Sequence, residues 1–180
     1  MRDGHEIDSR GVLEMKINMD QINACTREQF ITWLGTIFEH SPWVAASASA
    51  ARPFASVEAL HDAMMNVVRE SRVETIIDLF RAHPDLGTRL AVAEYSAIEQ
   101  QGAGLDQLTA DEYELFLGLN QTYVKSFGFP FIFAVRGKKK EDILAAMEAR
   151  LWHSAAEEIE QALREIEKIS GFRLRDLIME

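Results

Sequence analysis

The 180-residue sequence is poor in cysteine and proline, with one Cys and four Pro. A single cysteine, Cys25, excludes an intrachain disulfide and a zinc site built from the thiolates of one chain. No stretch approaches the roughly 20 consecutive apolar residues that a membrane-spanning helix needs, and residues 1–17 lack the apolar run of a signal peptide. These absences predict a soluble, cytoplasmic protein that binds no membrane.

Positive charge is also scarce, because 19 Lys and Arg face 29 Asp and Glu and the formal net charge is −10. The sequence has no basic cluster beyond residues 138–140, whereas binding to a phosphate backbone requires a basic face. Nucleic acid is therefore excluded as a partner. Hydrophobic residues make up 47% of the chain and charged residues 27%, which suits one folded domain with a real core.

Sequence motifs for metals and nucleotides are missing too. The histidines form no His-x-x-x-His pair, and no glycine-rich phosphate loop or Gly-x-Ser-x-Gly turn occurs. We therefore expect no metal and no nucleotide cofactor, so that any catalysis is carried out by side chains and backbone dipoles. The histidines are His5, His40, His61, His83 and His153.

Helix start signals recur along the chain, each a Ser or Thr that is able to cap a helix and is mostly followed by Glu or Gln three residues later. Apolar residues then follow at helical spacing, which predicts an all-α, compact single-domain helical bundle. Residues 157–168 are highly charged outside their apolar stripe and are predicted to form a solvated helix face. The start signals are Thr26, Ser56, Ser71, Ser96 and Thr109.

The boundaries follow from the same patterns. Residues 1–17 mix charges without an apolar period and are predicted to be a poorly structured extension of a single domain, residues 18–180. The helix that begins at Thr26 is expected to end at Ser41-Pro42, and Gly171 is expected to cap the end of the last helix.

Residues 129–135 break the helical pattern, because this short apolar run contains Pro130 and lies between Gly128 and Gly137. It is predicted to be a strand or a buried extended segment. Extended backbone leaves N–H and C=O groups that need partners. The segment is then either a hydrophobic plug between helices or a binding surface for a planar heterocycle with amide edges.

Two polar positions also allow two interpretations. His83 precedes Pro84 at a helix end and either stabilises the last carbonyls of that helix or performs acid–base chemistry near neutral pH. Glu99 either closes the capping box of Ser96 or belongs to a helix N-terminus that binds an anionic or carbonyl-rich small molecule. Spacing alone does not decide between them.

Several longer motifs follow one another along the chain. They are Phe38-Glu-His-Ser-Pro-Trp-Val44, Arg52-Pro-Phe54, His83-Pro-Asp-Leu-Gly87, Ser96-x-x-Glu-Gln100, Ala103-Gly-Leu105, Leu119-Asn120-x-x-Tyr123, Phe127-Gly-Phe-Pro-Phe-Ile132, and the closing helix from Ala162-Leu163 to Arg173-Leu174. In this order they resemble the 2-oxo-4-hydroxy-4-carboxy-5-ureidoimidazoline (OHCU) decarboxylase family, and the resemblance covers about residues 18–177.

This resemblance implies a homodimeric, all-helical enzyme of urate breakdown that decarboxylates OHCU to (S)-allantoin without a cofactor. It also implies that His83 is the catalytic proton donor, with Glu99 as its partner. Arg150 is the alternative to Arg173 as a substrate contact, and His153 is expected at the surface or in an interface. The implied substrate-binding residues are Pro84, Ser96, Gln100, Phe131, Ile132, Phe133, Ala134, Val135 and Arg173.

Two other functions stay open on the sequence: a helical interaction module that kept the fold without activity, and a decarboxylase of a related ureide. The enzyme requires His83, Glu99 and Arg173 to converge on one cavity. An interaction module would instead expose an apolar patch.

Overall fold

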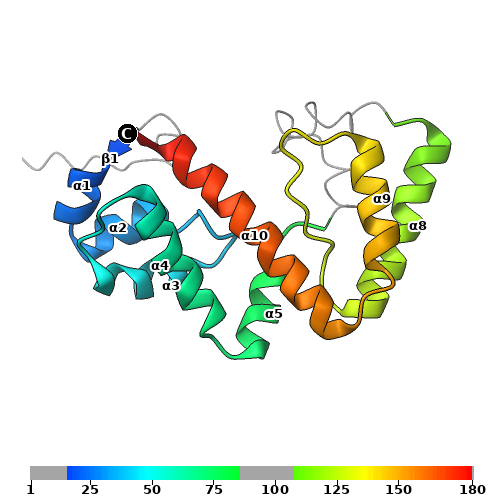
Figure 1. The fold of residues 1–180 in the computed structure, drawn as a ribbon, viewed down its shortest axis with the longest axis horizontal. Coiled ribbons are helices and arrows are strands. Elements are labelled where there is room, and N and C mark those ends of the chain that lie inside the picture. Colours follow the sequence, from blue (N-terminus) through cyan, green and yellow to red (C-terminus); the bar gives the residue numbers. More distant parts are fainter. Residues whose placement is uncertain (1–15, 86–107, 180) are drawn as a thin grey trace, which may run out of the picture. The chain divides into compact units, whose positions relative to one another are not determined.

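The computed structural model describes residues 16–85 and 108–179, which are mostly helical (Figure 1). This confirms the predicted all-helical class, with one pair of two-residue parallel strands added, β1 (Ile17–Asn18) and β2 (Ile178–Met179). None of the described helices is long and apolar enough to cross a membrane. The helices are α1 (Met19–Ala24), α2 (Arg27–Leu34), α3 (Pro42–Ala48), the 3-10 helix η2 (Ser49–Ala51), α4 (Val57–Arg69), α5 (Val73–Arg81), α8 (Ala110–Phe127), α9 (Lys140–Arg150) and α10 (Ala155–Leu177).

The chain forms two compact units, one of Met1–Ser71 with Ile169–Glu180 and the other of Arg72–Lys168. We call them the terminal unit and the central unit, and helix α10 contributes residues to both. In the terminal unit, Ile17 is buried and pairs with Ile178. The boundary between an extension and a domain at residue 18 stays a prediction, since the description begins at residue 16.

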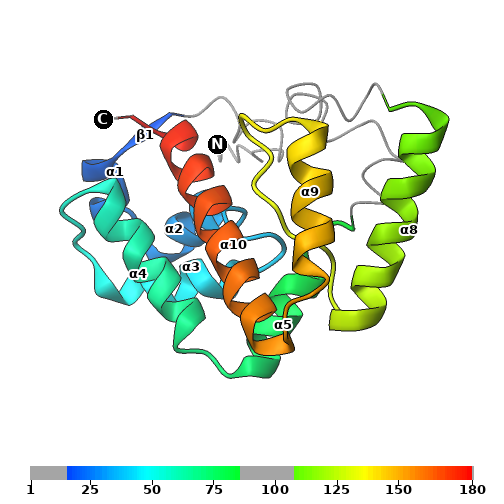
Figure 2. The same ribbon diagram turned by 45° about the vertical axis from the view of Figure 1, so that its right-hand side comes forward.

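In the terminal unit, α3 packs against both α2 and α4 (Figure 2). Phe30 of α2 and Leu60 of α4 are fully buried. Ser56 caps α4, as predicted, by accepting a hydrogen bond from the Ala59 N–H at 3.2 Å. Helix α1 was not predicted. Its start signal is a capping box of Asn18 and Gln21, in which each side chain accepts from the other's backbone N–H.

Two predicted helix ends in this unit are wrong. Helix α2 ends at Leu34, and Pro42 is the first residue of α3, a position where the missing N–H of proline costs nothing. Gly171 lies inside α10 rather than at its end. A Cβ at Gly171 would lie 3.1 Å from Cε1 of His61, so this glycine lets α4 approach α10 closely.

The central unit contains α5, α8, α9 and the first part of α10. Helix α8 begins with the predicted capping box of Thr109 and Glu112 and ends at Gly128, whose φ of 75° suits glycine. Helices α8 and α9 run side by side in the same direction, and residues 128–139 return between their opposite ends (Figures 1 and 2). This return path contains the apolar segment 129–135.

The predicted cap of α5 is wrong. Its N-cap residue is Arg72, not Ser71, and it makes no side-chain capping bond. The Ser71 hydroxyl instead donates to the carbonyl oxygen of Val67 at 2.7 Å, at the end of the preceding helix. A serine hydroxyl can either cap the following helix or donate to the carbonyl oxygen four residues earlier, and Ser71 does the latter.

Candidate functional site

The described residues include only part of the predicted site. Ser96, Glu99 and Gln100, with the capping box that begins at Ser96, lie outside the residues that the structure describes. His83, Pro84 and Phe131 to Val135 belong to the central unit, whereas Arg173 belongs to the terminal unit.

His83 follows the end of α5 and is buried. Its Nδ1 lies 3.1 Å from the carbonyl oxygen of Leu79. A carbonyl only accepts hydrogen bonds, so Nδ1 carries a hydrogen in this contact. His83 therefore bonds a carbonyl of the last turn of α5, as the helix-end interpretation expects. It is compatible with acid–base chemistry, because the contact fixes the imidazole orientation and assigns proton exchange to Nε2.

A side chain of helix α8 binds the side chain of Asp85, two residues after His83. The Asn120 Nδ2 donates to both carboxylate oxygens of Asp85, at 2.9 and 3.1 Å. Asn120 is buried, and within the described parts of the chain its Oδ1 is a buried side-chain oxygen without a hydrogen-bond partner. Asn120 belongs to the quoted motif Leu119-Asn120-x-x-Tyr123, although the sequence alone gave it no role.

The segment 129–135 forms neither helix nor strand, so the predicted strand is wrong. Its residues are buried or half-buried, and Phe133 is half-buried. Side chains bind two of its backbone groups: Arg150 Nη1 donates to the Ile132 carbonyl at 2.7 Å, and the Ala134 N–H donates to Glu165 Oε2 at 2.9 Å. Between them, the backbone N–H and C=O of Phe133 make no hydrogen bond with any described residue. Among the residues that the structure describes, these two peptide groups are therefore without a hydrogen-bond partner.

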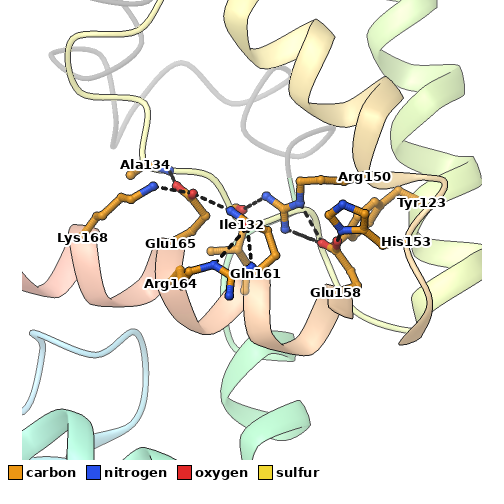
Figure 3. A network of polar contacts seen from close by, with 10 residues as sticks. All are labelled: Tyr123, Ile132, Ala134, Arg150, His153, Glu158, Gln161, Arg164, Glu165 and Lys168. Carbon is orange, nitrogen blue, oxygen red and sulfur yellow. Dashed lines mark hydrogen bonds and ion pairs between the residues drawn. The ribbon is translucent and has the colours of Figure 1, made fainter. Parts of the chain in front are cut away.

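Figure 3 shows the polar network beside this segment. Arg150 is 4% exposed, and its Nε donates to Glu158 Oε1 at 2.8 Å, with a further contact from Nη2 to the same oxygen. The guanidinium carbon lies 4.5 Å from the ring centroid of Phe131. Arg150 therefore makes an ion pair, a cation–π contact and the hydrogen bond to Ile132 in one buried place.

Tyr123 and His153 complete this network around Glu158. The Tyr123 hydroxyl donates to Glu158 Oε1, and burial of the ring raises the pKa of Tyr123 well above its usual value. The phenol is therefore a permanent donor at neutral pH. His153, expected at the surface or in an interface, is half-buried with Nδ1 2.8 Å from Glu158 Oε2.

The acidic residues of α10 overturn part of a prediction. Residues 157–168 were expected to be a solvated face outside their apolar stripe, yet Glu158 and Glu165 are buried. Their spacing with Ala162 is four and then three residues, which places all three on one face of the helix. That spacing was the sequence signal for buried carboxylates, and it was missed.

Arg173 occupies a more open position in the terminal unit. Its Nη2 donates to Glu39 Oε2 at 2.7 Å, and its Nη1 donates to the carbonyl of Ile37 at 3.1 Å. The two paired side chains are 28% and 21% exposed. Arg173 as a substrate contact stays a prediction.

Within residues 16–85 and 108–179, no group of three or more His, Cys, Asp or Glu side chains is arranged to hold a metal ion.

Comparison with known proteins gives concordant matches. The family model described as OHCU decarboxylase matches residues 23–175. The uric acid degradation bifunctional protein PucL of Bacillus subtilis is 47% identical over 162 residues, which are 90% of this chain and 33% of PucL. The 2-oxo-4-hydroxy-4-carboxy-5-ureidoimidazoline decarboxylase of Haloferax volcanii is 42% identical over 161 residues, 89% of this chain and 96% of that protein. The chain thus spans about a third of the bifunctional relative and nearly all of the archaeal one.

Solved structures agree with the fold. A crystal structure of (S)-allantoin synthase matches with a TM-score of 0.74 and 31% identity, covering 91% of this chain and 54% of that one. A crystal structure of OHCU decarboxylase in the presence of (S)-allantoin matches with a TM-score of 0.65 and 23% identity, covering 80% of this chain and 94% of that one. At that identity the second match supports the fold alone.

Proposed function

The chain belongs to the OHCU decarboxylase family, and we propose that it decarboxylates OHCU to (S)-allantoin in urate degradation, without a cofactor. The observation that carries this proposal is the extent of the similarity to the archaeal relative that is named for this activity. That similarity covers almost the full length of both proteins. The proposal also agrees with the buried histidine and the unpaired peptide groups described above.

The substrate supplies the electron sink for this reaction. When the C4–carboxylate bond breaks and CO2 leaves, its electron pair moves toward the adjacent ring C=N, whose nitrogen takes up a proton. Stabilising that developing charge is the task of nearby acids and hydrogen-bond donors. The C4 hydroxyl then becomes a carbonyl as C5 accepts a proton, and delivery of this proton to one face gives a single enantiomer.

His83 is the proposed proton donor and Glu99 its partner. The imidazole suits this role because it exchanges protons near neutral pH. Its burial and the contact of Nδ1 with Leu79 support a fixed orientation. Glu99 would orient the imidazole or the 4-hydroxyl of the substrate.

The remaining predicted residues are proposed to bind the substrate. The peptide groups of residues 131–135 would hydrogen-bond the amide edges of the imidazoline and ureido groups, and the Phe133 groups described above support this role. Arg173 would bind an anionic oxygen. Pro84, Ser96 and Gln100 would line the site.

The direct test generates OHCU in situ from urate with urate oxidase and hydroxyisourate hydrolase, and follows (S)-allantoin by circular dichroism. The chain is expected to accelerate formation of the S enantiomer well beyond spontaneous decay. Absence of acceleration by the folded protein would overturn the proposed function. Acceleration of a different ureide only would reassign the substrate.

The role of His83 is tested in the same assay. His83→Ala is expected to lower kcat by about 10²- to 10⁴-fold, the usual contribution of a general acid. His40→Asn is the matched control, because His40 is exposed and its φ of 45° is one that asparagine tolerates. Full activity of His83→Ala would show that another group delivers the proton.

Two further expectations belong to this proposal. The chain is proposed to act as a homodimer, which multi-angle light scattering of the purified protein measures directly. It is also proposed to act in the cytoplasm, which localisation of a tagged chain would test.

A further inference from the structure

Side chains of the central unit fix two backbone groups of the segment 129–135. Arg150 binds the carbonyl of Ile132, and Glu165 binds the N–H of Ala134 (Figure 3). Phe133 lies between these two residues in the sequence, and its own peptide groups make no hydrogen bond with the described residues.

Glu165 is the residue whose burial needs explaining. It is 3% exposed, a position that a carboxylate almost never takes unless it is paired. Its Oε2 accepts from the Ala134 N–H, while its Oε1 accepts from Gln161 Nε2 at 2.9 Å and from Lys168 Nζ at 2.8 Å. The charge is thus balanced by Lys168, and the orientation of the carboxylate is fixed by three donors.

We infer that Glu165 is a positioning residue for substrate binding: it binds the Ala134 N–H and so holds the Phe133 peptide groups in place for the substrate. This inference rests on the proposed function. Glu165 does not touch the substrate and acts only through the backbone of the segment. Arg150 fixes the carbonyl of Ile132, the residue that precedes Phe133, in the same way.

The test is the steady-state kinetics of Glu165→Ala with OHCU generated in situ. Peptide groups that bind the amide edges of the substrate bind the ground state and the transition state alike, so their displacement raises KM and leaves kcat largely unchanged. We expect KM to rise about tenfold, within the range that small displacements of positioning groups cause. A merely structural role would lower the folded fraction, which lowers the apparent kcat and leaves KM at the wild-type value.

Two further variants separate the hydrogen bond from the charge and from the helix. Glu165→Gln retains a side-chain oxygen that can accept from Ala134, and KM is expected to stay within about threefold of wild type. Glu160→Ala removes an exposed carboxylate from the same helix and is expected to change neither constant. Equal KM values for Glu165→Ala, Glu165→Gln and wild type would overturn the inference.

Hydrogen exchange gives a readout that needs no activity. In Glu165→Ala the amide of Ala134 loses its acceptor, so its exchange is expected to speed up by about tenfold or more, while Glu165→Gln keeps most of the protection. Amides in α4 serve as the internal reference. If wild type fails to accelerate OHCU decay, the proposed function fails. If wild type is active but Glu165→Ala retains its KM and its Ala134 protection, only the present inference fails.

Discussion

The two units each contain an arginine that bonds a carboxylate and a backbone carbonyl, yet the two arrangements differ in exposure. Arg150 in the central unit is 4% exposed and bonds Glu158, which is fully buried. Arg173 in the terminal unit has a side chain 28% exposed and bonds Glu39. The same chemistry is thus present once in the core and once near solvent.

The difference assigns different tasks to the two residues. A buried guanidinium with its donors engaged has little capacity to bind a substrate, and removing it leaves a desolvated carboxylate without its countercharge. A partly exposed ion pair such as Arg173–Glu39 contributes less to stability than a buried one. We therefore expect Arg150 to govern stability and Arg173 to govern activity, which favours Arg173 over Arg150 as the substrate contact.

The largest expected effect is that of Arg150→Met on stability. Loss of the guanidinium leaves Glu158 buried and unpaired, and breaking a buried ion pair in this way costs about 3–5 kcal/mol of unfolding free energy. Urea denaturation followed by circular dichroism measures this change. The segment 129–135 should become less ordered as well, because the Ile132 carbonyl loses its donor.

A double variant separates the lost pair from the lost packing. Arg150→Met/Glu158→Leu removes both charges, and apolar replacement of a buried pair is often neutral or stabilising. We expect it to regain a substantial part of the stability lost in Arg150→Met. A double variant no more stable than the single one would show that packing around Phe131, rather than the unpaired charge, explains the loss.

The next effect is that of Arg173→Met on activity. Charge-assisted hydrogen bonds to a bound anion contribute about 1.5–3 kcal/mol, so kcat/KM is expected to fall about 10- to 100-fold. The unfolding free energy should change by no more than about 1 kcal/mol, because the Glu39 pair is partly exposed. Kinetics with OHCU and urea denaturation on the same preparation measure both quantities.

Arg175→Met is the matched control, since Arg175 is an exposed arginine on the same helix. It should leave kcat/KM unchanged. The comparison between Arg150 and Arg173 would break if Arg173→Met retained full activity while folded Arg150→Met protein lost it.

Local signals in the sequence predicted the helices well where a cap and an apolar stripe coincide. The capping box at Thr109 and the glycine at 128 gave both ends of α8. The errors have two different causes. Ser71 has a choice of hydrogen-bond partners and bonds back to Val67, whereas Gly171 lies where His61 packs closely against the helix. The second cause is a tertiary contact between distant residues, which local spacing does not contain.

The site was less predictable, and for a related reason. The sequence pattern singled out His83 and the segment 129–135, and resemblance to a family supplied their roles. The network of Arg150, Glu158 and Glu165 depends instead on long-range pairing. Charged residues are expected at the surface unless a partner is known. The one sequence signal for their burial was that Glu158 and Glu165 lie on the same helix face as Ala162. Nothing in the sequence identified Ala134 as the donor to Glu165.

The smallest expected effect is a pH dependence of stability that comes from Tyr123, in the buried network around Glu158. Tyr123 donates to Glu158, and burial is the main cause that raises the pKa of the phenol in the folded protein. In the unfolded chain the same phenol ionises near its usual value of about 10. Above about pH 10, the folded state therefore binds more protons than the unfolded state.

The sign follows from linkage: the stability conferred by the protonated phenol is complete below about pH 10 and is lost as the pH rises toward the raised pKa of the folded state. The unfolding free energy of wild type should fall by about 1.4 kcal/mol for each pH unit above about pH 10 from this group. Tyr123→Phe lacks this contribution, although its loss of a hydrogen bond lowers stability by a constant amount at lower pH. Urea denaturation of both proteins from about pH 8 to about pH 11 measures the difference. Parallel pH profiles would show that Tyr123 reaches solvent and that the network around Arg150 is less buried than the pair of Arg150 and Glu158 implies.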